Sequence, residues 1–126
     1  MREIHLDTNF LIGVSQHSLS EDKLLRRWLN QRLSVRTSTV AWAEFLCGPL
    51  HTDAASSVRG LIGEPIPLTE EDARRAAELF NATGRRRGSL NDCMIGAIVM
   101  RSEAALATND TAHFTHFVSL GLKIAE

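Results

Sequence analysis

The chain has 126 residues, 44% of them hydrophobic, and a formal net charge of −1, which is typical of one globular domain rather than a disordered chain. The 14 basic and 15 acidic residues nearly balance, which excludes a protein that coats nucleic acid through bulk positive charge. No apolar run reaches the ~20 residues of a membrane span, and the N-terminus lacks the features of a signal peptide. We therefore expect a single cytoplasmic domain over residues 1–126 that makes no contact with a membrane.

Short apolar strands alternate with amphipathic helices along the chain. The predicted elements, in chain order, are a strand at 3–6, a helix from residue 8 that breaks near Gly13 or at 15–18, a helix from about residue 20, a strand at 33–37, a helix capped by Ser38 or Thr39, a weak helix at 52–61, a strand at 65–68, a helix at 69–80, a helix at 89–102, a strand at 104–108 and a further strand at 122–124.

This alternation predicts an α/β fold, with a mostly parallel sheet of four to five strands between two layers of helices. Strand–helix–strand units form right-handed crossovers, which place helices on both faces of such a sheet. Ligands bind beyond the carboxyl ends of the strands in sheets of this kind. Residues that directly follow a strand are therefore the first candidates for a functional site.

Four acidic residues stand out by their positions. Asp7 directly follows the first strand, Asp110 lies just beyond the strand at 104–108, and Asp92 lies in the first turn of the helix at 89–102. Glu44 lies in a helical segment that is otherwise nearly all apolar. Each residue alone is compatible with a helix cap, a turn or a solvated helix face. Together they suggest a shared divalent cation, and oxygen ligands favour Mg²⁺ or Mn²⁺ over zinc.

Four segments of the chain contain these acids: residues 4–9, 39–44, 91–97 and 106–110. Together these segments resemble PIN domains, with the greatest likeness to the VapC toxins of bacterial toxin–antitoxin pairs. The resemblance covers nearly the whole chain and implies a single PIN-like domain whose acidic tetrad is Asp7, Glu44, Asp92 and Asp110.

The resemblance implies a Mg²⁺- or Mn²⁺-dependent endoribonuclease, the toxin of a VapBC-type pair. Asp7, Asp92 and Asp110 would bind the ion, and Glu44 would hold metal-bound waters or accept a proton from the attacking water. Three further residues match positions that orient ligands or water in PIN domains: Thr8, Asn9 and Thr108.

The expected partners are an RNA substrate, a cognate VapB-type antitoxin and a second copy of the chain. The run Arg85, Arg86 and Arg87 is the candidate clamp for RNA phosphates. Its alternative role is a solvated helix end at which arginines complement the helix dipole. Trp28 and Trp42 lie at helical spacing with leucines, which indicates a core or a homodimer interface.

Two other classes of protein stay open. An aspartate-based phosphotransferase also has an aspartate after its first strand, but a dehalogenase-like phosphatase needs a second aspartate where this chain has Asn9. A receiver domain needs a late lysine, for which Lys123 is the candidate. The second class is a non-catalytic PIN-like binding module, although an inert scaffold has no physical reason to crowd like charges together. His113 and His116 are expected to be ordinary surface or packing residues.

Overall fold

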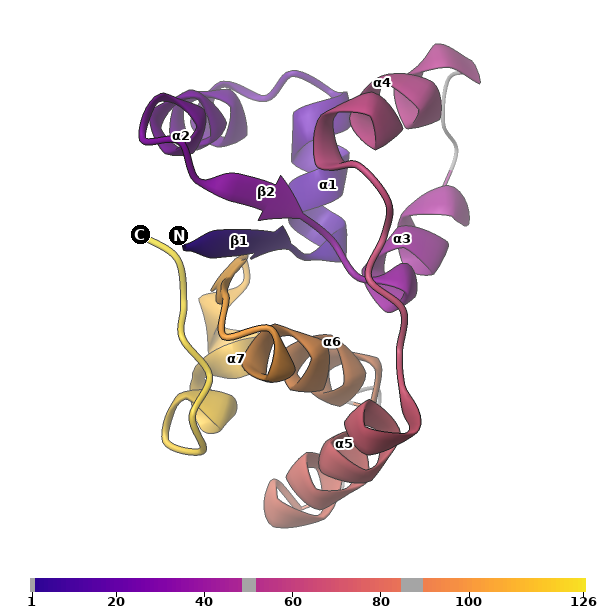
Figure 1. Ribbon diagram of the computed structural model, residues 1–126, viewed down its shortest axis with the longest axis vertical. Helices are drawn as coiled ribbons and strands as arrows, with labels where there is room; N and C mark the ends of the chain where they lie inside the picture. Colours follow the sequence, from indigo (N-terminus) through magenta and orange to yellow (C-terminus); the bar gives the residue numbers. More distant parts are fainter. Residues whose placement is uncertain (1, 49–51, 85–89) are drawn as a thin grey trace.

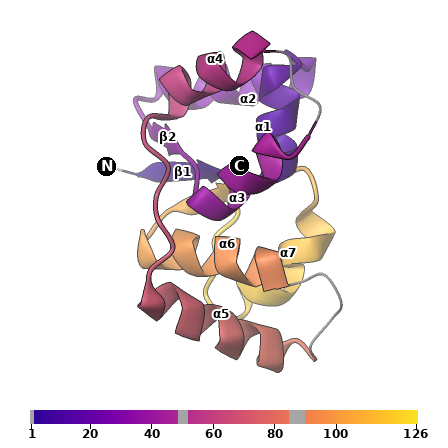
Figure 2. The same ribbon diagram turned by 90° about the vertical axis from the view of Figure 1, so that its right-hand side faces the viewer.

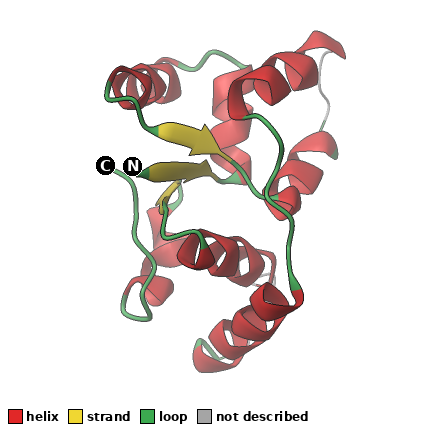
Figure 3. Ribbon diagram, in the orientation of Figure 1, coloured by secondary structure: helices red, strands yellow, loops and turns green. Residues whose placement is uncertain are grey.

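A parallel sheet of three short strands lies at the centre of the computed structural model, which describes residues 2–48, 52–84 and 90–126 (Figures 1 and 3). The strands β1 (Glu3–Leu6), β2 (Ser34–Arg36) and β3 (Ala105–Ala107) are arranged in the order β2-β1-β3. The chain therefore leaves the central strand towards one edge of the sheet and later returns to the other edge. This change of direction opens a crevice at the carboxyl end of β1, the usual ligand position in such sheets.

The predicted α/β fold is confirmed, but the prediction of four to five strands is wrong for the described residues. The segment at 65–68 pairs through a single parallel bridge between Ser38 and Ile66. Ile66 makes both backbone hydrogen bonds of this bridge, to the Thr37 carbonyl oxygen and from the Thr39 N–H. The ladder ends there because the next donor, the Leu68 N–H, bonds to the Thr39 side-chain oxygen at 3.3 Å instead of a backbone carbonyl. The segment at 122–124 likewise forms one bridge, to Leu106 of β3.

Seven helices of the described chain flank this sheet. Along the long axis of the molecule, α1, α2 and α4 lie at the β2 end, and α5, α6 and α7 lie at the β3 end, with α5 packed along α6 (Figures 1 and 2). The helices are α1 (Thr8–Ser15), α2 (Leu19–Asn30), α3 (Thr39–Leu46), α4 (Thr52–Ile62), α5 (Glu70–Ala82), α6 (Leu90–Arg101) and α7 (Thr111–Val118).

Side-chain caps fix where several helices begin. Asp7 accepts a hydrogen bond from the Phe10 N–H at 2.8 Å and so caps α1. Ser38, one of the two predicted caps, accepts from the Ala41 N–H at 3.1 Å at the start of α3. Of the two predicted ends of this first helix, near Gly13 or at 15–18, the second is observed: α1 ends at Ser15, where the polar stretch begins.

The core lies between the sheet and the two groups of helices, and it includes Trp28. The Trp28 side chain is 2% exposed, and its ring lies 5.5 Å from that of Phe10. Its Nε1–H donates to the Glu126 carbonyl oxygen at 3.1 Å. Trp28 therefore belongs to the core of one chain and offers no surface to a second copy. Trp42 is half-buried and packs against Phe45. The homodimer stays a prediction.

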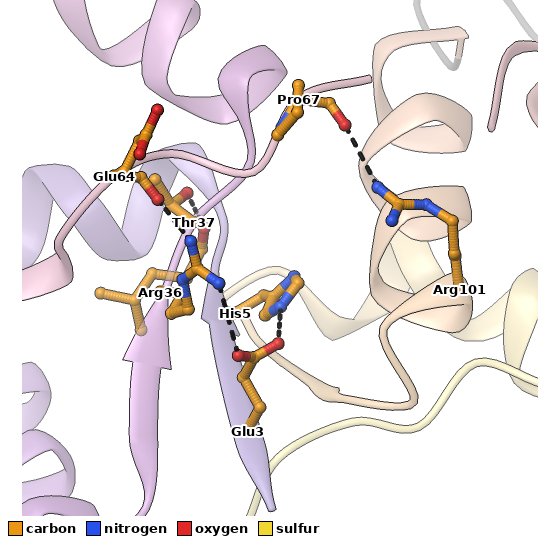
Figure 4. Close-up of polar contacts among 8 residues, drawn as sticks. Glu3, His5, Arg36, Thr37, Glu64, Pro67 and Arg101 are labelled. Atoms are coloured by element: carbon orange, nitrogen blue, oxygen red, sulfur yellow. Dashed lines mark hydrogen bonds and ion pairs between the residues drawn. The ribbon is translucent and has the colours of Figure 1, made fainter. Parts of the chain in front are cut away.

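Two arginines attach the segment between α4 and α5 to the rest of the molecule (Figure 4). Arg36 Nη2 donates to the Glu64 carbonyl oxygen at 2.7 Å, and Arg101 Nη2 donates to the Pro67 carbonyl oxygen at 3.1 Å. Arg101 Nε also donates to Asp72, a carboxylate that is 1% exposed, at 2.8 Å. Both arginines thus hold the segment through its backbone.

His5 lies in the same polar cluster and is 1% exposed (Figure 4). Its Nε2 lies 2.8 Å from Glu3 Oε2, and the other oxygen of this carboxylate, Oε1, lies 3.8 Å from Arg36 Nη1. Burial lowers the pKa of His5, although the Glu3 carboxylate opposes this. The ring is therefore neutral near neutral pH, and its Nδ1 has no hydrogen-bond partner among the described residues.

Candidate active site

The four acids predicted from the sequence line one cavity at the carboxyl ends of β1 and β3. Asp7 follows β1, and Asp110 follows β3 at the start of α7. Asp92 lies in the first turn of α6, and Glu44 lies on α3. All four residues line a cavity of about 130 Å³. Residues from four separate parts of the chain therefore face one space.

Asp7 is the most buried of the four acids and is 4% exposed. Burial raises the pKa of its carboxyl group, and the nearby carboxylates of Asp110 and Glu44 raise it further. Hydrogen bonds from Thr108 and from the Phe10 N–H act in the opposite direction. Asp7 is thus held in place by two donors, but its negative charge is poorly compensated.

The rise in pKa is larger at Asp92 than at Asp7. Its pKa is raised to about 6, first by burial and then by the negative charges of Glu44, Asp7 and Asp110. The imidazole of His113 opposes the rise. Both carboxyl groups thus have a raised pKa, mainly because they are buried and further because other carboxylates lie nearby.

Glu44 is held by neutral donors on both of its oxygens. Thr8 Oγ1–H donates to Oε1 at 2.9 Å, and Asn91 Nδ2–H donates to Oε2 at 3.2 Å. Thr8 thus makes the kind of orienting contact that the resemblance implies, and Asn9 also lines the cavity. Asn91 was not predicted to take part in the site, although its position beside Asp92 in the first turn of a helix could have suggested it.

Two residues close to Asp110 in the sequence, His113 and Asn109, take different positions relative to the cavity. His113 lines the cavity, with Nδ1 at 3.2 Å from an Asp110 oxygen and 3.8 Å from an Asp92 oxygen. From the sequence, an ordinary surface or packing residue was expected here, because α7 was not predicted; the i, i+3 spacing from Asp110 is the signal that could have placed His113 in the site. Asn109 donates to Glu21 at 2.7 Å, so Asp110 rather than Asn109 is the residue of this pair that lines the cavity.

The donor set suits a hard divalent cation. Carboxylates, hydroxyl and amide oxygens and one imidazole line the cavity, and none of the described lysines or arginines does. In the described part of the chain, no three His, Cys, Asp or Glu side chains stand close enough together to hold an ion without moving.

Two further predictions do not concern the residues described above. The phosphate clamp predicted at Arg85, Arg86 and Arg87 lies outside the described residues and stays a prediction. Among the helices that are described, none is both long enough and apolar enough to cross a bilayer.

The sequence matches the PIN domain family over residues 4–117. The chain therefore belongs to the PIN domain family, whose members are typically nucleases and generally depend on a metal ion. The matched range includes all four acids that line the cavity. Comparison with curated proteins finds no match.

Several solved structures share the fold. VapBC2 from Rickettsia felis, bound to a DNA fragment from its promoter, is 20% identical with a TM-score of 0.73 over 98% of this chain and 96% of that chain. FitAcB from Neisseria gonorrhoeae is 21% identical with a TM-score of 0.70 over 98% and 96% of the two chains. A toxin–antitoxin complex from Klebsiella pneumoniae is 21% identical with a TM-score of 0.71 over 89% of each chain. The predicted PIN-like fold is confirmed.

Proposed function

We propose that this chain is a Mg²⁺- or Mn²⁺-dependent endoribonuclease and the toxin of a VapBC-type toxin–antitoxin pair. The observation that carries the proposal is the cavity lined by four carboxylates, two of which have a raised pKa. Membership of the PIN domain family supports nuclease chemistry. Likeness in fold to a toxin–antitoxin complex supports the biological role.

Asp7, Asp92 and Asp110 would hold the ion. When bound, Mg²⁺ or Mn²⁺ supplies positive charge to the scissile phosphate and lowers the pKa of a bound water. Asp7 is the most firmly fixed of the three, because the Phe10 N–H and Thr108 both donate to it. The positive charge of the ion would offset both causes of the raised pKa of Asp7 and Asp92, which are burial first and the nearby carboxylates second.

Glu44 would accept the proton of the attacking water. Its two oxygens are oriented by Thr8 and Asn91, neutral donors that leave the carboxylate its full charge. In-line attack of this water on the phosphorus would leave a 5′-phosphate and a 3′-hydroxyl. No histidine serves as a nucleophile in this scheme.

Cleavage of end-labelled RNA by the purified chain tests the enzymatic part of the proposal. Cleavage is expected with Mn²⁺ and is expected to be lost in EDTA. Glu44→Gln should reduce the rate about 100-fold or more, the usual contribution of a general base. Glu78→Gln, which removes an exposed carboxylate on α5, is the matched control and should cleave like the wild type. A wild-type protein that neither cleaves RNA nor gains stability with Mn²⁺ would instead favour a non-catalytic binding module.

Expression in bacteria tests the biological part. The chain should arrest growth, and Glu44→Gln should not. A short open reading frame directly upstream of the gene should encode an antitoxin that restores growth and co-purifies with the chain. Growth arrest that persists in the Glu44→Gln variant would separate the toxicity from the cavity.

A further inference from the structure

A buried carboxylate outside the cavity contacts the segment that carries Asp110. Glu21, in the first turn of α2, is 6% exposed. Its Oε1 accepts a hydrogen bond from Asn109 Nδ2 at 2.7 Å and another from Ser20 Oγ at 3.0 Å. Asn109 stands between Thr108 and Asp110 in the connection from β3 to α7. The contact therefore reaches the part of the chain that supplies two residues to the candidate site.

Gly13 shows how closely Glu21 is fitted against α1. A Cβ atom at Gly13 would lie 2.6 Å from Cγ and Cδ of Glu21 and 2.7 Å from its Oε2. Any larger residue would therefore displace the carboxylate or the helix. Glycine weakens a helix interior relative to alanine, so the close approach of Glu21 gives a reason for glycine at this position. The Glu21 carboxylate is confined between α1 and Asn109.

Neutral groups stabilise the charge of Glu21. Burial alone would raise its pKa, but hydrogen bonds from Ser20, Asn109, Ser18 and its own backbone N–H keep the pKa below the ordinary value. Hydrogen bonds to an ionised carboxylate are roughly twice as strong as those between neutral groups. The Asn109 amide is therefore strongly held on the side away from the cavity.

We infer that Glu21 and Asn109 form a positioning pair for the proposed nuclease site. Asn109 is anchored to Glu21, and the next residue, Asp110, lines the cavity. The Asp110 N–H donates to Thr108 Oγ1 at 3.0 Å, and Thr108 in turn hydrogen-bonds to Asp7. The anchor thus fixes the direction in which Asp110 faces and the position of the donor to Asp7. The inference rests on the proposed function, because it names what holds two of the proposed metal ligands in register.

Exchange of donor and acceptor tests the pair. Asn109→Asp replaces the donor by a second carboxylate facing that of Glu21, whereas Glu21→Gln/Asn109→Asp restores a donor–acceptor pair in the reverse direction. Asn109→Ala removes the donor without adding charge and serves if Asn109→Asp does not fold. Asp22→Asn removes a charge from the same helical turn and is the matched control.

Three measurements follow these variants: hydrogen exchange of the Asp110 amide, the Mn²⁺ concentration that gives half of the thermal shift, and the rate of RNA cleavage at saturating Mn²⁺. Asn109→Asp and Asn109→Ala should each change all three by about tenfold or more, as is usual for residues that orient metal ligands. The double variant should return to within about threefold of the wild type. Asp22→Asn should leave all three unchanged.

A glycine comparison gives a second test. Gly13→Ala should reproduce the effects of Asn109→Ala, because it displaces Glu21. Gly60→Ala, inside α4 with open space around the added Cβ, should leave the three measurements unchanged and raise the melting temperature.

Two results would overturn the inference. One is wild-type behaviour of both Asn109 variants, and the other is a folded double variant that stays as impaired as Asn109→Asp. If the wild type neither binds Mn²⁺ nor cleaves RNA, the proposed function fails. Hydrogen exchange of the Asp110 amide would still decide whether the Glu21–Asn109 pair orders the connection from β3 to α7.

Discussion

Replacement of Asp92 by asparagine should stabilise the metal-free protein. The pKa of Asp92 is raised from 3.8 to about 6, with burial as the main cause. This change corresponds to about 3 kcal/mol at high pH, since each pKa unit is worth about 1.4 kcal/mol. The side chain is 25% exposed, so solvent screening reduces the expected gain for Asp92→Asn to about 1–3 kcal/mol. Asparagine matches aspartate in size and carries no charge, so the variant removes the repulsion and keeps the packing.

The gain should depend on pH in a defined direction. Because the folded-state pKa lies above the unfolded value, the folded protein binds this proton more tightly than the unfolded chain does. The contribution of Asp92 to stability is therefore fully present below pH 3.8 and is lost as the pH rises through about 6. The free energies of unfolding of the wild type and of Asp92→Asn should differ most above about pH 7 and converge as the pH falls from about 6 to 4.

Urea unfolding in EDTA at pH 8 and pH 5, with equal m-values, measures this difference. Asp53→Asn on the exposed face of α4 is the control and should change stability by less than about 1 kcal/mol at both pH values. Added Mn²⁺ should stabilise the wild type more than Asp92→Asn, because a ligand stabilises the state that binds it. Two results would refute the reasoning that burial and nearby carboxylates raise the pKa of Asp92: a variant no more stable than the wild type at pH 8, or a difference in stability that does not shrink at pH 5.

Three further predictions address other parts of the molecule. Asp7→Asn should abolish RNA cleavage. Its melting temperature in EDTA should equal or exceed that of the wild type, because asparagine can still accept the hydrogen bond from the Phe10 N–H that caps α1. Wild-type activity of this variant would remove Asp7 from the mechanism. Stability should fall as the pH drops below 6.5 through the contribution of His5, whose pKa is lowered by burial, and an NMR titration that gives a His5 pKa at or above 6.5 would contradict this. Arg101→Ala should cost about 2–4 kcal/mol of unfolding free energy, because it leaves the Asp72 carboxylate buried without its cation. The double variant Asp72→Asn/Arg101→Ala should recover part of that loss, and a single variant as stable as the wild type would show that the ion pair contributes nothing.

The parts of the site that could be predicted from sequence are those with a local signal. Asp7 directly follows one apolar strand, and Asp110 lies shortly after the end of another. The rule that ligands bind at the carboxyl ends of strands was therefore enough to predict that both acids belong to one site. Glu44 was identifiable because apolar residues surround it. Each of these signals comes from residues adjacent in the sequence, so it can be recognised without a structure.

The features that were missed depend on tertiary contacts or on weak local patterns. The apolar segment at 65–68 predicts a strand, but it forms only one bridge, because the Leu68 N–H bonds to the Thr39 side chain instead of continuing the ladder. The α7 helix is eight residues long, and its main signal is the three-residue spacing of the buried Phe114 and Phe117. Without α7, the contact of His113 with the acids could not be foreseen. Glu21 and Asn109 are 88 residues apart, and no local pattern connects them.

The two arginine contacts shown in Figure 4 imply that the segment between α4 and α5 tolerates amino-acid change better than the two arginines that hold it. Arg36 and Arg101 bind the carbonyl oxygens of Glu64 and Pro67, which every amino acid possesses. Homologous chains should therefore vary at the two acceptor positions and keep a guanidinium at the two donor positions. A saturation library should show the same asymmetry, with many residues accepted at position 64 and few at position 101.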